Sequence, residues 1–129
     1  MPVKYDYDPE SHILHARPYG KIAITDILGY FDAVAEDTDI PSGIIEVVHF
    51  DNVEDFLFFS DNASTVPEKY KQLKDRKKIR ETIFVAGGDI QFGISRMFQI
   101  LFDINDITEN VIVVRTEDEV QPLIKKIRG

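Results

Sequence analysis

The chain has 129 residues, with 15 Lys and Arg against 23 Asp and Glu, no Cys and 43% hydrophobic residues. This length predicts a single domain over residues 1–129 that needs neither disulfides nor a structural metal. The lack of Cys excludes thiolate metal sites, thiol nucleophiles and disulfides, and the net charge of −8 argues against nucleic acid or an anionic membrane surface as a partner.

The first predicted elements form a hairpin. Apolar and charged residues alternate from Val3 to Asp8, which is typical of an edge strand with one buried and one solvated face. The turn at residues 8–11 contains Asp, Pro and Ser, and Ile13 to Tyr19 is predicted to return as the antiparallel partner, ending at Gly20.

A helix capped by Thr25 is predicted next, and it should end near Asp37. The following segment, Ile44 to Phe50, is apolar on both faces, which indicates an interior strand at the centre of the sheet. Residues 51–65 show no clean periodicity, so we expect a loop with a short helical or extended piece.

The second half of the chain alternates helices with strands. A helix with Pro67 in its first turn is predicted to follow Ser64 or Thr65 and to run to about Lys78. The stretch from Lys69 to Arg80 is basic but has one aromatic residue, so we expect a solvated helix face rather than a nucleic-acid site.

An interior strand at residues 82–86 leads through Gly87-Gly88-Asp89 into a helix at 90–102. The apolar residues of that helix that are predicted to face the sheet are Ile90, Ile94, Met97, Leu101 and Ile104. A third interior strand at 111–115 and a last helix complete the chain, with a capping box at residues 116–119 and Pro122 shortening, kinking or delaying the helix.

The predicted order is therefore β-β-α-β-α-β-α-β-α. It indicates an α/β fold in which an N-terminal antiparallel hairpin leads into a mostly parallel sheet with helices on its faces. The chain start has no signal-peptide core and its apolar runs are too short to span a bilayer, so we expect a cytoplasmic protein without membrane insertion.

Several polar residues suggest chemistry that their surroundings do not support. His49, Asp51 and Ser60 are the residue types of a hydrolytic triad, but His49 and Asp51 should share one face of a strand, and Ser60 lacks a Gly-x-Ser-x-Gly elbow. His12 and His15 should lie on opposite faces of a strand and cannot jointly bind a metal. No catalytic residue, metal or cofactor is predicted, and an enzyme using His49 and Asp51 remains the less favoured alternative.

Gly87 and Gly88 precede a helix, where backbone N–H groups can hold an anion. The carboxylate of Asp89 would repel phosphate, so a tight strand-to-helix turn is the favoured interpretation. Glu46 is either an acid with a raised pKa or a residue at the solvated end of its strand.

The five Tyr and nine Phe are the feature of the sequence that is hardest to explain by folding alone. If the loop after the central strand meets the next helix at the carboxyl edge of the sheet, the rings form an apolar surface of the kind where open α/β folds bind ligands. The alternative is that the loop buries its own rings. The predicted binding residues are Asp51, Phe56, Phe58, Phe59, Gly87, Gly88 and Phe92.

The same pattern resembles the SpoIIAA-like group, small bacterial domains related in fold to STAS domains and to CRAL-TRIO lipid-binding domains. The segments that carry the resemblance are Tyr7-Asp8-Pro9-Glu10 to Gly20-Lys21, the Thr25 helix, Ile44 to Asp51, Ile83 to Gly88, the helix containing Phe98, and Val111 to Glu119. The resemblance implies a non-enzymatic α/β domain.

STAS antagonists carry an Asp-Ser-(Ser)-Gly signature with a phosphorylated Ser, which residues 60–65 do not reproduce. Ser60, Ser64 and Thr65 are the candidate phosphorylation sites for an alternative function as an anti-sigma-factor-antagonist type of switch. The leading hypothesis is a regulatory domain that binds a protein partner, a second copy of itself as a homodimer, or a small apolar ligand.

Overall fold

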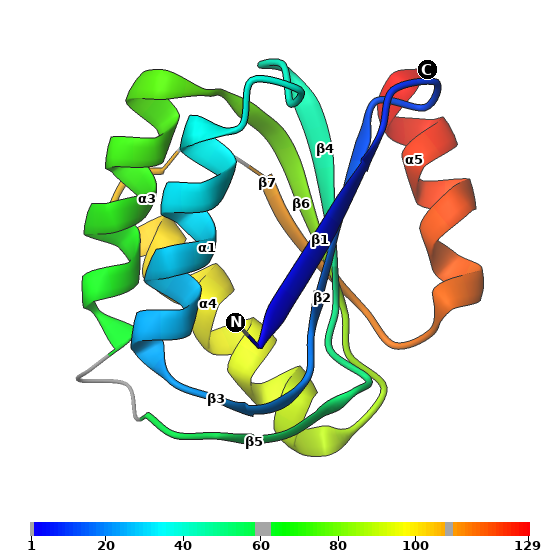
Figure 1. Ribbon diagram of the computed structural model, residues 1–129. Helices are drawn as coiled ribbons and strands as arrows, with labels where there is room; N and C mark the ends of the chain where they lie inside the picture. Colours follow the sequence, from blue (N-terminus) through cyan, green and yellow to red (C-terminus); the bar gives the residue numbers. More distant parts are fainter. Residues whose placement is uncertain (1, 59–62, 108–109) are drawn as a thin grey trace.

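The computed structural model describes residues 2–58, 63–107 and 110–129. Its main sheet has the strand order β1-β2-β4-β6-β7, with α1, α3 and α4 on one face and α5 on the other (Figure 1). The strands are β1 (Val3–Asp8), β2 (Ile13–Pro18), β4 (Ile44–His49), β6 (Ile79–Val85) and β7 (Asn110–Val114). The helices are α1 (Ile24–Glu36), α3 (Thr65–Arg76), α4 (Asp89–Ile104) and α5 (Val120–Arg128).

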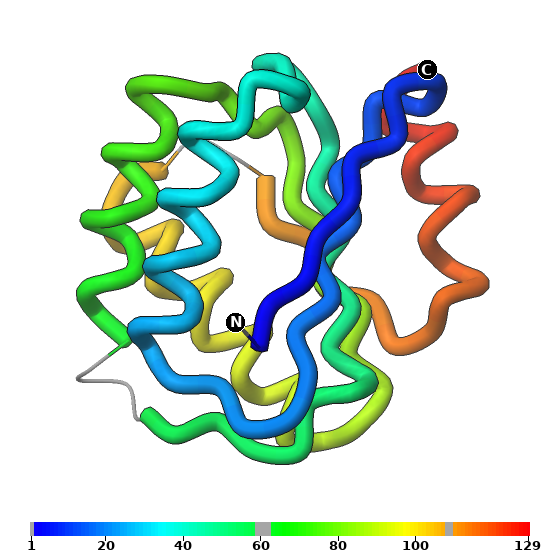
Figure 2. Tube along the Cα trace, viewed as in Figure 1, coloured from blue at the N-terminus to red at the C-terminus, as the bar shows by residue number. Residues whose placement is uncertain are grey.

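The predicted hairpin is confirmed, with β1 as the antiparallel edge strand beside β2. The carboxylate of Asp8 stabilises the turn, because it accepts hydrogen bonds from the backbone N–H of Glu10 at 3.0 Å and from the Ser11 hydroxyl at 2.7 Å. Figure 2 shows that this turn lies beside the C-terminus, and Arg128 there donates to the carbonyl oxygens of Ser11 and His12.

The central strand is β4, as predicted. It pairs in parallel with β2 on one side and with β6 on the other, and every residue from Ile44 to Val48 is buried. The predicted strand at 111–115 is β7, but it lies at the far edge of the sheet and not in its interior. An apolar run indicates that both faces of a strand are covered, but it does not indicate whether the strand has a neighbour on each side. This is why an edge strand was predicted to be an interior one.

A second, two-stranded parallel sheet was not predicted. It pairs β3 (Gly20–Ile22) with β5 (Val53–Phe56), and the two strands run side by side past the carboxyl ends of the main-sheet strands (Figure 1). Gly20 has a positive φ of 69°, which lets the chain turn sharply from β2 into β3. The segment after Asp51, which shows no clean periodicity in the sequence, is therefore partly extended.

Helix α4 is rotated relative to the prediction, although Ile94, Met97 and Leu101 still pack against the core as partly buried residues. The side chains that it buries are Ser95, Phe98 and Phe102, whereas Ile90 and Ile104 are 64% and 70% exposed. The rings provide the reason, because Phe98 packs against Phe58 and Phe84 while Phe102 contacts Tyr70 at 4.8 Å between centroids. Ser95 is tolerated inside because its hydroxyl donates to the Gln91 carbonyl of the same helix at 2.8 Å.

The C-terminal segment follows the predicted capping box. A 3-10 turn, η1 (Glu117–Glu119), precedes α5, and the Glu119 carboxylate accepts the backbone N–H groups of Arg115 and Thr116 at 2.9 Å each. Pro122 lies in the first turn of α5, where its missing N–H costs no helical hydrogen bond. The α-helix begins at Val120, after the 3-10 turn, which is the late start that was one of the predicted outcomes.

The sheet separates a large apolar cluster under α1, α3 and α4 from a smaller one under α5. Among the residues that the structure describes, no helix is long and apolar enough to cross a bilayer.

Glu46 is an acidic residue inside the large apolar cluster, and it is buried rather than at a solvated strand end. The Thr82 hydroxyl donates to it at 2.8 Å, and the Tyr30 hydroxyl donates to its other oxygen.

Burial raises the pKa of Glu46, although the bonds from Tyr30 and Thr82 oppose this effect. A raised folded-state pKa means that the stability due to this group is complete below the pKa of the unfolded chain and is lost as pH rises through the folded value. We expect Glu46→Gln to melt increasingly above the wild type as pH rises from 5 to 9 in thermal unfolding. The exposed substitution Glu54→Gln is the control, and parallel curves for Glu46→Gln and the wild type would contradict the raised pKa of Glu46.

The orientation of the segment after β5 gives a second prediction. Phe58 is 5% exposed and Leu57 is 55% exposed, so Phe58→Ala should cost about 3–5 kcal/mol of unfolding free energy while Leu57→Ala stays within about 0.5 kcal/mol. Urea unfolding of the two variants measures the difference, and equal costs would show that the segment presents its ring to solvent.

Candidate functional site

The carboxyl ends of the parallel strands bring the predicted polar residues together. Strands β4, β6 and β7 end in register at His49, Val85 and Val114. The residues that follow therefore meet, and the Asp51 carboxylate accepts the backbone N–H of Gly87 at 3.4 Å. Of the predicted binding residues, Asp51, Gly87, Gly88 and Phe92 lie at this edge.

Arg115 is the residue at this edge that the sequence analysis missed. Its guanidinium lies 3.9 Å from the ring centroid of Phe92 and donates to the Gly87 carbonyl at 3.2 Å and to the Asp89 carboxylate at 3.4 Å. A cation over an aromatic face fixes both groups. Its position at the end of the last strand could have predicted this location. The carboxyl ends of parallel strands meet at one edge of the sheet, and this rule applies to Arg115 as it does to Asp51 and Gly87.

Neighbouring groups of the protein itself occupy the surroundings of the Gly87-Gly88 turn. The Gly87 amide already faces the Asp51 carboxylate, and a Cβ on Gly87 would lie 3.3 Å from the Arg115 carbonyl oxygen. The Gln91 side chain fills the space beside Gly88 and donates to the Val53 carbonyl at 2.9 Å. These contacts fit the tight strand-to-helix turn and tie α4 to β5.

The expected aromatic surface is corrected by the structure. Phe56 is 9% exposed, and its ring lies 5.4 Å from Phe50 and 5.7 Å from Phe58 between centroids. Phe58 continues this series of rings to Phe98 of α4 at 6.0 Å. The loop therefore buries its own rings, because the apolar area of a ring is worth more inside than at the surface. Phe92 is half-buried, and Phe59 lies outside the described residues.

Other side chains supply the exposed apolar area at this edge. Leu57 and Ile90 are 55% and 64% exposed, and Leu57 adjoins the ring contact between Phe58 and Phe98 that holds this segment against α4. Exposed carboxylates lie close to them in the sequence, on β5 just before Leu57, at Asp89 just before Ile90, and on the turn after β4. We call the set of exposed residues Asp51, Glu54, Asp55, Leu57, Asp89 and Ile90 the carboxyl-edge surface.

The histidines do not form the triad that was considered from the sequence. His49 contacts Glu117 and His15, whereas Asp51 contacts Gly87, and Ser60 lies outside the described residues. His12 lies in the hairpin turn and pairs with the Tyr7 hydroxyl at 3.0 Å. Within residues 2–58, 63–107 and 110–129, no group of three His, Cys, Asp or Glu side chains is arranged to hold a metal ion.

An internal cavity of about 60 Å³ lies between the sheet and helices α1, α3 and α4. Its wall is apolar apart from Glu46, Tyr30 and Thr82, and it is separate from Asp51, Gly87 and Arg115. A dry cavity of about 150 Å³ is the size known to accept benzene. A space of this volume therefore suits a few small atoms rather than a drug-sized apolar ligand.

Ser64 and Thr65 are the described members of the predicted phosphorylation set. Both are exposed at the beginning of α3, with Ser64 directly before its first residue. The segment joins the aromatic loop to the helix, so these two side chains lie at a helix N-terminus.

Comparison with models of protein families found no match, and comparison with curated proteins found none either. Solved structures do match. An uncharacterized protein of the DUF3478 family with a SpoIIAA-like fold, from Shewanella loihica PV-4, is 9% identical, covers 95% of this chain and 91% of its own, and has a TM-score of 0.56.

The anti-sigma factor antagonist SpoIIAA in its unphosphorylated form is 12% identical, with 98% of each chain covered and a TM-score of 0.55. At such identities the likeness concerns the fold. The chain is a mixed α/β protein with a SpoIIAA-like fold.

Proposed function

We propose that this chain is a non-enzymatic regulatory domain that binds a protein partner through the carboxyl-edge surface. The observation that carries the proposal is the exposure of Leu57 and Ile90 among carboxylates, at the edge where the strand ends converge. Apolar side chains rimmed by polar ones are typical of protein interaction sites. The likeness to a protein described as an anti-sigma factor antagonist supports a regulatory role.

The charge of the carboxyl-edge surface indicates the charge that a partner should carry. Asp51, Glu54, Asp55 and Asp89 are exposed, while the neighbouring cation Arg115 is engaged by Phe92 and Asp89. The whole chain has a net charge of −8. A partner with basic side chains around an apolar contact is therefore complementary, and its association should be faster at low ionic strength.

An apolar ligand and an enzymatic role have less support. The cavity of about 60 Å³ is smaller than benzene needs, and Asp51, Gly87 and Arg115 do not line it. His49 and Asp51 make their hydrogen bonds with different groups, which gives an acid–base pair no support.

The test begins with capture of a partner by the tagged chain from an extract of the source organism, followed by its purification and calorimetric titration. We expect Leu57→Ser combined with Ile90→Ser to weaken binding at least tenfold. Glu54→Lys should slow association and reduce its dependence on salt. Ile104→Ser, which alters an equally exposed residue at the far end of α4, is the matched control and should bind as the wild type does.

Equal affinity of the double variant and the wild type would contradict the carboxyl-edge surface. If Ile104→Ser weakens binding as strongly as the double variant does, the contact lies along α4 instead.

Control by phosphorylation is the second candidate function, and the exposure of Ser64 and Thr65 at the start of α3 favours it. A phosphate at a helix N-terminus interacts favourably with the helix dipole. The SpoIIAA structure is described as an unphosphorylated form, which implies a phosphorylated form of that protein.

This candidate predicts phosphate on Ser64 or Thr65 in protein purified from the source cells, measured by mass spectrometry. It also predicts that Ser64→Asp raises the unfolding free energy by about 0.3–1 kcal/mol. Gln72→Asp adds the same charge later in α3 and should not stabilise it. Unmodified Ser64 and Thr65, with equal stability of the two variants, would oppose the candidate.

A further inference from the structure

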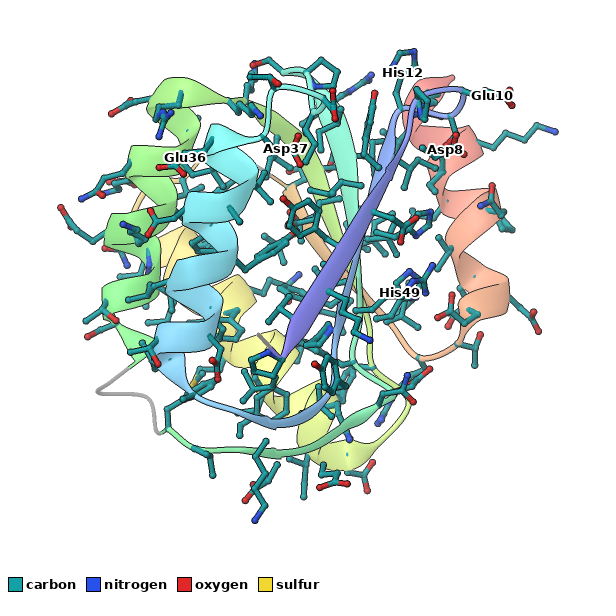
Figure 3. All side chains as sticks on the ribbon, viewed as in Figure 1. Asp8, Glu10, His12, Glu36, Asp37 and His49 are labelled. Carbon is teal, nitrogen blue, oxygen red and sulfur yellow. The ribbon has the colours of Figure 1, made fainter. Side chains whose placement is uncertain are left out.

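Three side chains from distant parts of the sequence form a continuous hydrogen-bonded chain on the α5 face of the sheet. Glu117 Oε1 lies 2.5 Å from His49 Nδ1, and His49 Nε2 lies 3.0 Å from His15 Nδ1. Figure 3 shows His49 on the side of the sheet that faces α5. We call Glu117, His49 and His15 the Glu-His-His chain.

The two imidazoles meet edge to edge. Their centroids are 5.2 Å apart and their planes are inclined by 27°. This separation corresponds to the N···N distance plus the two ring radii, so one proton lies in line between the rings. The carboxylate fixes the direction of the chain, because it accepts the Nδ1 proton of His49 and leaves Nε2 to interact with His15.

The Glu-His-His chain ties the beginning of α5 to the sheet. Glu117 belongs to η1, which leads directly into α5, whereas His15 and His49 lie on β2 and β4. At the other end of α5, Arg128 donates to the hairpin turn and Arg80 donates to the Ile127 carbonyl at 3.2 Å. The helix is thus fastened to the sheet at both ends, and the fastening at its beginning contains titratable groups.

Further charges face the histidines from β1 and β2. Asp6 is opposite His15 in the β1–β2 ladder, Asp8 lies two residues further along β1, and Arg17 follows on β2. The α5 residues that pack on this face, namely Val120, Leu123, Ile124 and Ile127, are apolar. Asp6 and Asp8 favour a charged His15, and Arg17 and a charged His49 oppose it.

We propose that the Glu-His-His chain is an acid-sensitive latch that holds the beginning of α5 on the sheet at neutral pH and releases it when both imidazoles are protonated. The first added proton is accommodated, because a charged His49 donates to Glu117 and to His15 at once. The second proton leaves no acceptor between the rings and places two positive charges about 3 Å apart.

The environment of His15 supports this order of protonation. Burial, followed by the effects of His49 and Arg17, lowers the pKa of His15 below its ordinary value, and Asp6 and Asp8 offset part of this shift. Release of the latch therefore takes up a proton. Between the ordinary histidine pKa and the lowered value, the open population should rise by up to tenfold per pH unit as pH falls.

Hydrogen exchange of the intact chain between pH 7.5 and 5, corrected for the intrinsic exchange rate, tests the latch. We expect the backbone amides of residues 117–124, apart from Pro122, which has none, to lose protection by roughly tenfold per pH unit between the ordinary and the lowered pKa of His15, while those of α4 keep theirs. His15→Gln retains an amide donor for His49 and does not titrate, so its protection should not depend on pH. His12→Gln, in the hairpin turn, is the matched control and should follow the wild type.

An NMR titration of the imidazole carbons in the same samples identifies which histidine takes up the proton. Unchanged protection at residues 117–124 after His15 has titrated would overturn the latch. Equal loss of protection in the wild type and in His15→Gln would overturn it too, and neither outcome depends on the carboxyl-edge surface.

Discussion

Burial of β4 on both of its faces is the constraint on which the remaining structure depends. Ile45 and Val47 face α5, while Ile44, Glu46 and Val48 face the three helices on the opposite side. A parallel strand that is buried in this way needs crossover helices, and it aligns its carboxyl end with those of its neighbours. Asp51, Gly87 and Arg115 therefore meet although they are far apart in the sequence.

The two faces of the sheet are covered unequally, and this difference has chemical consequences. Three helices exclude water from one face, and this burial raises the pKa of the Glu46 carboxyl. One short helix covers the other face, where His15 remains half-buried and the attachment of α5 relies partly on polar contacts at its two ends. Interactions of this kind respond to pH, whereas purely apolar packing does not.

The described aromatic rings of the loop after β4 stabilise the structure from its interior. Rings from Phe50 through Phe56 and Phe58 to Phe98 are in contact across β4, β5 and α4. Their burial turns α4 so that aliphatic residues such as Ile90 face water at the carboxyl edge. The proposed binding surface is thus a consequence of how the core is filled.

Local patterns in the sequence determined the order of the main-sheet strands and of the described helices, the edge hairpin, the central strand and the capping box at Thr116, because periodicity and turn chemistry act over a few residues. The rule that parallel strands end at one edge also predicted that Asp51 and Gly87 lie together. The facing direction of α4, the β3–β5 pair and the contact of His49 with His15 and Glu117 were decided by the tertiary structure. These features depend on which segments pack side by side, and residues separated by 34 and 68 positions leave no periodic signal of their contact.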